Sequence, residues 1–391
     1  MEKLTIGLFG FGVVGEGIYK VLSNKKELGC KIKKIAIKDP TKKRNAPSSL
    51  FTTSANDLIN DDEIDLIVEL IDDADIAFKI VSNAMNKGKS VVSANKKMIA
   101  THHLELIELS KRNNVSFLYE AAVCGSVPII RNLEEYFDND LLTYITGIVN
   151  GSTNYILSKM KNDNLSYENA LSEAKKNGFA ESDPTLDVEG IDAAYKISII
   201  TLHAFGKHIQ AEDIIRKGIT SLKENDFLYA KEKGLVIKLI AKSHLNNKGE
   251  LKDISVLPTF IEKEKSLSNT NNEFNGVLIG SSLADEQFLY GKGAGRYPTS
   301  SAVLSDISAI KYGYKYEYKK GIKNNLAHSK QTTKCYVSFD SEVTFDRSIF
   351  DSIKEEYSCE YTRYIIGYLQ PDLLKNTPIF DDKRISLICY N

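Results

Sequence analysis

The chain has 391 residues, which is enough for two or three domains, each with a substantial core. Its composition is ordinary for a globular protein, with 42% hydrophobic and 26% charged residues. The formal net charge of −1 at pH 7 favours neither nucleic acid nor a membrane surface as a partner.

The apolar runs are short, and those such as residues 197–205 cannot span a bilayer. A strand-like run follows Met1 directly, which leaves no room for a signal peptide. The five cysteines are scattered and form no C-x-x-C pair. We therefore expect a cytoplasmic protein with reduced thiols.

The first 130 residues alternate between short apolar runs and segments of helix length. The apolar runs have the length of strands and lie at residues 4–9, 32–37, 64–70, 90–93 and 115–119. Alternation of this kind predicts a parallel sheet covered by helices, which is the α/β architecture of a Rossmann-type domain.

The first strand leads into a glycine-rich loop, GFGVVG, at the point where a helix is expected to begin. The first glycine allows a tight turn, the second lets the backbone approach a pyrophosphate, and the third lets the helix pack against the strand. A purely structural turn is the alternative, but the position between strand and helix favours dinucleotide binding. The residues that we expect to hold the cofactor here are Gly10, Phe11, Gly12, Val13, Val14 and Gly15.

The end of the second predicted strand bears on the choice between NAD and NADP. Lys38 stands at the strand end and is followed by Asp39 and by the basic run 42–44. Cations accommodate a 2′-phosphate, whereas a carboxylate grips the ribose 2′-hydroxyl. Lys38 favours NADP, Asp39 leaves NAD open, and a solvated basic turn remains an alternative.

Polar residues also follow the apolar run at 90–93. Ser93 and Lys96 lie where open parallel sheets bind ligands, at the carboxyl edge. A lysine at that edge can polarise a bound oxygen as a fixed cation. Lys97 beside it is interpreted as a surface lysine.

Residues 191–206 have the pattern of a helix that ends at Gly206. Asp192 and Lys196 are then four residues apart on one helical face. A surface ion pair is the simpler reading, but the other positions of the helix are largely apolar, so we expect this face to line a cleft. Glu181 lies shortly before the helix, where it could meet the ammonium group of a zwitterionic substrate.

At this point the sequence resembles the homoserine dehydrogenase family. The family signature matches at fixed spacings, and three further segments match in the family's order, at 119–130, 147–160 and 290–303. The resemblance covers about residues 1 to 318. The signature positions are Ala174, Gly178, Asp183, Pro184, Asp187, Gly190, Asp192 and Lys196.

The resemblance implies reversible, NAD(P)-dependent interconversion of L-homoserine and L-aspartate 4-semialdehyde, a step of threonine and methionine biosynthesis. Lys196 matches the family's proton donor and acceptor, and Lys96 matches the lysine that holds substrate beside the nicotinamide. Glu181 and Asp192, together with Asp187, match positions that bind the substrate.

The resemblance also implies further parts of the site. Gly178 and Gly293 match turns that close over the cofactor. The preference for NADP over NAD is expected from Lys38. A structural monovalent cation, usually sodium, is expected, and so is a homodimer built through the sheet of the middle domain. The residues that match the cation site are Glu120, Val123, Gly125 and Val127.

Three departures from the family pattern concern the cofactor more than the reaction. Asp72 and Asp73 stand where the family usually has two glycines after the fourth strand, so two acids come near a pyrophosphate. Ser126 replaces a frequent glycine in the cation loop, and Lys292 replaces a frequent proline.

The expected domains are a nucleotide domain at 1–130, completed by 295–318, a substrate-binding and dimerisation domain at 131–294, and a small C-terminal unit at 319–391. That unit should be α+β, with a helix at 348–358, and ACT-like in a degenerate form without a threonine site. Two other classes stay open: a dehydrogenase for another small amino acid, and a non-catalytic NAD(P) sensor. The presence of both lysines at 96 and 196 argues against a sensor.

Overall fold

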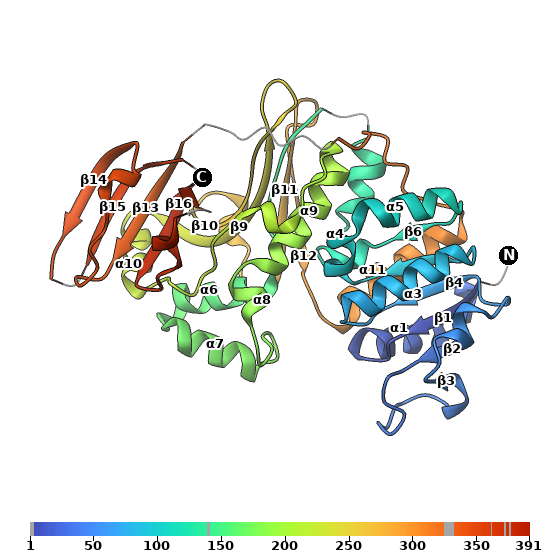
Figure 1. Cartoon of the computed structure of the whole chain (residues 1–391). Coiled ribbons are helices and arrows are strands. Elements are labelled where there is room, and N and C mark those ends of the chain that lie inside the picture. The colour runs from blue at the N-terminus through green and yellow to red at the C-terminus, as the bar shows by residue number, and fades with distance from the viewer. Residues whose placement is uncertain (1–3, 139–140, 324–331, 361, 371–372, 375–376) are drawn as a thin grey trace. The chain divides into compact units, whose positions relative to one another are not determined.

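The computed structural model describes residues 4–138, 141–323, 332–360, 362–370, 373–374 and 377–391 (Figure 1). The chain forms two compact units. Unit 1 comprises Met1–Asp138 and Lys292–Gly321, and unit 2 comprises Asn139–Gly291 and Ile322–Asn391. None of the helices in the described residues has the length and apolarity that a membrane crossing needs.

Unit 1 is built on a parallel sheet in the strand order β3-β2-β1-β4-β5-β6. The order reverses at β1, which places the carboxyl ends of β1 and β4 at the switch point where open α/β sheets bind ligands. The prediction of a Rossmann-type sheet is confirmed. The strands are β1 (Leu4–Phe9), β2 (Cys30–Ala36), β3 (Phe51–Thr52), β4 (Leu66–Glu69), β5 (Ser90–Ser93) and β6 (Phe117–Leu118).

Helices cover this sheet, and one of them comes from far along the chain. Helix α11 packs against α1, where the Oγ of Ser300 donates to the carbonyl of Val14 at 3.2 Å. Gly17 permits the approach, because a Cβ there would lie 2.5 Å from that hydroxyl. The helices are α1 (Val13–Asn24), α2 (Asn56–Ile59), α3 (Ala74–Asn86), α4 (Lys96–Thr101), α5 (His103–Arg112) and α11 (Arg296–Lys311).

Unit 2 contains a mixed sheet whose first part has the order β12-β11-β7-β9-β10, with β8 (Ile215–Arg216) beside β10. Its strands are β7 (Leu142–Ile148), β9 (Leu235–Leu245), β10 (Leu251–Glu262), β11 (Phe274–Ser281) and β12 (Glu286–Lys292). The helices of this unit are α6 (Gly151–Asp163), α7 (Tyr167–Lys176), α8 (Thr185–Val188), α9 (Ile191–Phe205) and α10 (Glu224–Glu232). Helix α9 is buried almost all round, which explains why its sequence is apolar on most positions.

The C-terminal strands continue the same sheet in the order β16-β13-β15-β14, joined to β10 by parallel pairing with β16. Within this group each neighbouring pair is antiparallel, which is the strand order of a ferredoxin-like β-α-β-β-α-β unit. Of the two connections that carry helices in that topology, the first holds a 3₁₀ turn at Arg347–Ile349, and the second holds helical residues at 373–374 and a 3₁₀ turn at Pro378–Asp381. The strands are β13 (Thr333–Phe339), β14 (Ser352–Ser358), β15 (Arg363–Leu369) and β16 (Ile385–Tyr390).

The predicted helix at 348–358 is wrong, because most of this segment forms the edge strand β14. Apolar residues four positions apart, Ile349, Ile353 and Tyr357, imitate a helical period. Pairing with β15 overrides that period, and a register irregularity between Ile353 and Glu355 shifts the alternation of the strand.

Candidate active site

The glycine-rich loop of unit 1 has the geometry that its spacing predicts. Gly10 has φ +93°, and a Cβ there would lie 2.7 Å from the carbonyl oxygen of Leu70. A Cβ on Gly15 would lie 2.4 Å from the carbonyl oxygen of Gly10. Gly12, the N-cap of α1, has nothing within 4 Å of its Cβ position. The protein itself therefore requires the first and third glycines, whereas the second leaves room for a ligand at a helix N-terminus.

At the end of β2, hydrogen bonds engage the one carboxylate that could select NAD. Asp39 accepts from both the backbone N–H (2.8 Å) and the hydroxyl (2.6 Å) of Thr41, and these bonds lower the pKa of Asp39. Lys38 is exposed.

A cavity of about 470 Å³ lies in the segment that follows β2. Arg44 lines it, stacks over the ring of Phe51 at 5.6 Å, and has a buried Nε without a hydrogen-bond partner in the described part of the chain. Lys38 is absent from the lining. The lining residues are Ile37, Pro40, Lys42, Arg44, Ala46, Ser48, Phe51, Thr52 and Thr53.

A buried carboxyl group that sequence reasoning missed lies beneath the carboxyl ends of β4 and β5. Glu69 accepts the Ser93 hydroxyl at 2.6 Å and the N–H of Ile71 at 2.6 Å, and it is fully buried. Ser93 in turn accepts the N–H of Asn95 at 3.1 Å, immediately before Lys96 begins α4. Burial raises the pKa of Glu69 to about 7. The predicted residues Ser93 and Lys96 therefore belong to a corner that Glu69 holds together.

Of the two acidic residues that follow β4, Asp72 and Asp73, the second has a structural role. Asp73 is the N-cap of α3, and its carboxylate accepts from the N–H groups of Asp75 (3.1 Å) and Ile76 (2.9 Å). The charge of Asp73 is thereby stabilised by the helix N-terminus. Asp72 is exposed, and its charge contributes to the raised pKa of Glu69.

In unit 2, Asp192 and Lys196 form a buried ion pair. The Nζ of Lys196 lies 2.7 Å from Oδ2 of Asp192 and donates to the carbonyl of Val149 at 2.8 Å. The two side chains are only 10% and 3% exposed for Lys196 and Asp192, which excludes the solvated surface pair. The predicted proximity on one helical face is therefore confirmed, and the pair is held against the end of β7.

Asn150, which sequence reasoning also missed, connects this pair to a second carboxylate. Its Nδ2 donates to Oδ2 of Asp192 at 2.8 Å and to Oδ1 of Asp187 at 2.7 Å. Its Oδ1 accepts the N–H of Thr153 at 2.9 Å and thereby caps α6. An asparagine directly before a helix is a typical N-cap, but nothing in the sequence indicates its contacts with the two carboxylates.

The structure does not bring Glu181 into this cluster. Glu181 is exposed in the segment between α7 and α8, and in the described residues it makes no hydrogen bond or ion pair. Gly178, at the start of that segment, has φ +76° and open space around its Cβ position. Asp183, in the same segment, accepts from the nearby Thr185, and Glu189, directly after α8, accepts from Thr220.

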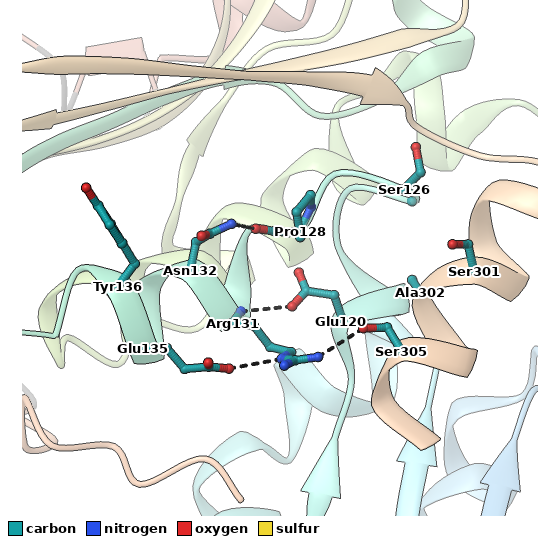
Figure 2. Close-up of a pocket in the computed structure, with 11 residues that line it drawn as sticks. Glu120, Ser126, Pro128, Arg131, Asn132, Glu135, Tyr136, Ser301, Ala302 and Ser305 are labelled. Atoms are coloured by element: carbon teal, nitrogen blue, oxygen red, sulfur yellow. Dashed lines mark hydrogen bonds and ion pairs between the residues drawn. The ribbon is translucent and has the colours of Figure 1, made fainter. Parts of the chain in front are cut away.

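Glu120 is the predicted carboxylate ligand of a cation, and it is buried in unit 1 (Figure 2). Its two oxygens accept the N–H groups of Ile130 and Arg131, each at 2.8 Å, and burial raises its pKa to about 7. Asp306 accepts the N–H of Glu120 at 2.9 Å with one oxygen, whereas its Oδ1 is buried without a hydrogen-bond partner in the described residues. A nearby cation would compensate both buried carboxylates.

The rest of the predicted cation loop is tied to the turn after β12. A Cβ on Gly125, which has φ +59°, would lie 2.4 Å from the carbonyl oxygen of Gly293. Ser126 donates its N–H at 3.0 Å and its hydroxyl at 3.1 Å to the carbonyl of Lys292. The serine at 126 therefore adds a side-chain hydrogen bond to this backbone contact, which a glycine could not make.

The predicted cation ligands lie in one short stretch, and two of them share a cavity. Glu120 and Gly125 both line a space of about 420 Å³ beside α11 (Figure 2). The carbonyl of Val127 accepts the N–H of Ile129 at 2.9 Å, and Val123 is buried. A buried carboxylate that lines a cavity together with a residue of the same loop suits a hard cation.

Comparison with known protein families decides the relationship. One family model described as homoserine dehydrogenase matches residues 128–308, and another, described as the NAD-binding domain of homoserine dehydrogenase, matches residues 10–120. Homoserine dehydrogenase of Bacillus subtilis is 38% identical over 319 residues, which are 79% of this chain and 73% of the relative. The chain belongs to the homoserine dehydrogenase family.

Solved structures of homoserine dehydrogenases agree with this. The enzyme from Thiobacillus denitrificans superposes with a TM-score of 0.87 at 28% identity, covering 100% of this chain and 99% of the other. A hyperthermophilic archaeal homoserine dehydrogenase mutant in complex with NADPH gives a TM-score of 0.69 at 26% identity, covering 81% of this chain and 99% of the other.

The homoserine dehydrogenase resemblance predicted from the motifs is thus confirmed, and with it the fold class. The chain is an oxidoreductase of this family, and its unit 1 carries the domain for a nicotinamide cofactor. The two open alternatives, a dehydrogenase for another amino acid and a non-catalytic sensor, have no support from these matches.

Proposed function

We propose that this member of the homoserine dehydrogenase family interconverts L-homoserine and L-aspartate 4-semialdehyde with Lys196 as the general acid and base, in threonine and methionine biosynthesis. The observation that carries this proposal is the burial of the Lys196 ammonium group between Asp192 and the carbonyl of Val149. A lysine held in this way has a fixed direction and little access to bulk water.

The proposed proton transfer uses one atom. In the oxidation, the Nζ of neutral Lys196 takes the hydroxyl proton of homoserine, and in the reduction it returns a proton to the aldehyde oxygen. The nicotinamide, when bound, accepts or supplies the hydride. Asp192 stabilises the protonated form of Lys196 at 2.7 Å and keeps the side chain aimed at one position.

Asp187 and Asp192 are proposed to face the ammonium group of the substrate. Asn150 holds both carboxylates, and their two negative charges favour a cationic ligand. Glu181, which matches the family's third substrate carboxylate, is exposed in its segment. We propose that it reaches the ammonium group only when that segment, with Gly178, folds over bound substrate and cofactor.

In unit 1, the loop from Gly10 to Gly15 is proposed to bind the pyrophosphate and Lys96 to bind substrate next to the nicotinamide. NADP is the preferred cofactor in this proposal, because Thr41 engages Asp39 and because a cation-lined cavity follows β2. Arg44, with its unpaired buried Nε, is the residue in that cavity most suited to a 2′-phosphate. Lys38 is proposed to add a screened, longer-range attraction.

Three further assignments follow from the family. A monovalent cation, usually sodium, would be held by the carboxylate of Glu120 and the loop carbonyls of residues 123, 125 and 127, with a structural role. A homodimer is proposed through the sheet of unit 2, whose edge strand β12 exposes Phe288 (37%) and Tyr290 (51%). The C-terminal strands are proposed to be an ACT-like unit without an effector site.

The decisive experiment measures nicotinamide absorbance with L-homoserine, comparing NADP with NAD. L-Homoserine should drive reduction of the cofactor, whereas L-serine, which is one methylene shorter, should drive little. Turnover should be faster at low NADP than at low NAD. A protein that binds the cofactor yet gives no absorbance change with homoserine in either direction would contradict the proposal.

A further inference from the structure

The two ends of the Asn150 side chain have separate tasks. The oxygen caps α6 through Thr153 N–H (2.9 Å), and the nitrogen spans Asp187 and Asp192. This orientation of the amide is fixed by chemistry, because ionised carboxylates cannot donate and a backbone N–H cannot accept. Asn150 is 5% exposed, so none of these bonds is made in open solvent.

We propose that Asn150 is a positioning residue for the reaction, which sets the placement of Asp192 and, through it, the direction of the Lys196 ammonium group. The inference rests on the proposed roles of Lys196 and Asp192. Oδ2 of Asp192 accepts both the Asn150 amide at 2.8 Å and the Lys196 ammonium at 2.7 Å. The residue before Asn150 supplies the carbonyl that accepts the other bond from Lys196.

The corner between β7 and α6 thus fixes Lys196 along two routes. Val149 contacts the ammonium group directly, and Asn150 contacts it through Asp192. Asn150 also places a neutral donor between the two carboxylates, so that they do not face each other unscreened and can both attract a substrate ammonium group. A charged lysine in the place of Asn150 would neutralise this pair and remove its attraction for substrate.

In the described residues, the charged groups in direct contact with the Asn150–Asp187–Asp192 cluster include Lys196 on α9. Lys238 of β9 faces the same helix α6 one turn further along, where it donates to Asn154 at 3.1 Å. Glu189, at the end of α8, accepts from Thr220. Removal of the Asn150 donor therefore acts mainly on Asp192 and Asp187.

The cap and the bridge are separable by substitution. Asn150→Ser and Asn150→Asp both keep an oxygen that can cap α6, and both lose the amide donor. We expect Asn150→Ser to lower kcat about 10- to 100-fold, the range for a lost hydrogen bond to a charged group, with cofactor affinity unchanged. Asn150→Asp should lose more, because it adds a third carboxylate.

The pH profile distinguishes positioning from a structural role. Loss of the donor changes the hydrogen bonding of the Asp192–Lys196 pair that the reaction uses, so the pH profile of kcat/KM for homoserine should move by about one unit. Asn154→Ser is the matched control, because Asn154 is a buried amide on the same helix that donates to the carbonyls of Thr270, Asn272 and Phe274. It should lower the melting temperature and leave kcat and the pH profile unchanged.

Turnover is the rate divided by the concentration of sites that bind NADPH, which leaves misfolded protein out of the comparison. The inference is overturned if Asn150→Ser keeps wild-type kcat and pH profile, if Asn154→Ser reproduces its effects, or if neither variant at 150 yields any binding sites. Lys196→Ala separates this from the proposed function. If Lys196→Ala is inactive and Asn150→Ser is normal, only the inference fails, whereas an active Lys196→Ala removes the function on which it rests.

Discussion

The chain turns from a strand into a helix at the end of β1 in unit 1 and at the end of β7 in unit 2, and the two corners are built in opposite ways. The first omits side chains, because Cβ atoms on Gly10 and Gly15 would meet backbone oxygens at 2.7 Å and 2.4 Å. The second buries side chains, because Asn150 and the carbonyl of Val149 hold Asp192 and Lys196.

This difference follows from what each corner is proposed to bind. A pyrophosphate is recognised by backbone N–H groups, which only a bare loop can present closely. A proton must be exchanged with one substrate oxygen, which needs a charged group in a fixed direction. The first corner should therefore be damaged by added atoms, and the second by removed ones.

Removal at the second corner should have the largest effect. Lys196→Ala takes away both the transferable proton and the positive charge near the developing alkoxide. Turnover should fall by about 10²–10⁴-fold, the usual contribution of general acid–base catalysis, while the cofactor still binds. Steady-state absorbance together with a cofactor titration measures both quantities.

Lys196→Arg tests the chemical character of the group at the same place. Arginine keeps the charge beside Asp192, but guanidinium scarcely deprotonates, so this variant should also be severely impaired. Near-normal turnover of the arginine variant would mean that Lys196 only anchors the substrate electrostatically.

Addition at the first corner should have the next largest effect, and the loop offers its own control. Gly15→Ala places a methyl group against the Gly10 carbonyl, so it should lower stability by about 1–3 kcal/mol and weaken cofactor binding. Gly12→Ala meets no protein atom within 4 Å, so it should leave stability nearly unchanged and weaken cofactor binding alone. Thermal unfolding and cofactor titration separate the two. If Gly12→Ala binds the cofactor normally, the second glycine does not face the pyrophosphate.

The proposed preference for NADP depends on side chains that follow β2 in unit 1, Arg44 and Lys38. Arg44→Ala should raise the Michaelis constant for NADP about tenfold and leave that for NAD nearly unchanged, because only NADP carries the 2′-phosphate. Lys38→Ala should act in the same direction with a smaller effect that vanishes at high salt, because Lys38 is exposed. If each substitution changed the Michaelis constants for NADP and NAD equally, Arg44 and Lys38 would not bind the 2′-phosphate and would belong to a solvated turn.

The predictions that proved correct depend on residues that are close together in the sequence. Each of these features spans only a few residues: the glycine spacing, each strand run of unit 1, and the i,i+4 relation of Asp192 and Lys196. Asn150 and Glu69 were missed because their partners are remote. Asn150 lies 37 and 42 residues from its two carboxylates, and Glu69 lies 24 residues from Ser93.

The C-terminal strands show the converse error. The period of residues 348–358 suggested a helix, but the segment becomes strand β14 because β15 offers it a pairing partner. Short segments with ambiguous period are decided by such contacts. Glu181 is a different case, because the motif match assigns it a role in substrate binding while its side chain is exposed.

The smallest predicted effect concerns the buried carboxyl group of Glu69, at the carboxyl end of β4 in unit 1. The pKa of Glu69 is raised from 4.5 to about 7 by burial. Between these values the folded protein keeps a proton that the unfolded chain releases, so the free energy of unfolding falls as pH rises through this window.

Glu69→Gln should remove this proton. The slope of unfolding free energy against pH should then flatten by about 1.4 kcal/mol per pH unit between about pH 4.5 and 7. Glutamine still offers an oxygen to the N–H of Ile71 and a polar group to Ser93, so turnover should change little. Chemical denaturation at several pH values measures the slope. An unchanged slope in Glu69→Gln would mean that Glu69 stays ionised in the folded protein, and that the corner beneath Lys96 holds a fixed negative charge as the corner beneath Lys196 does.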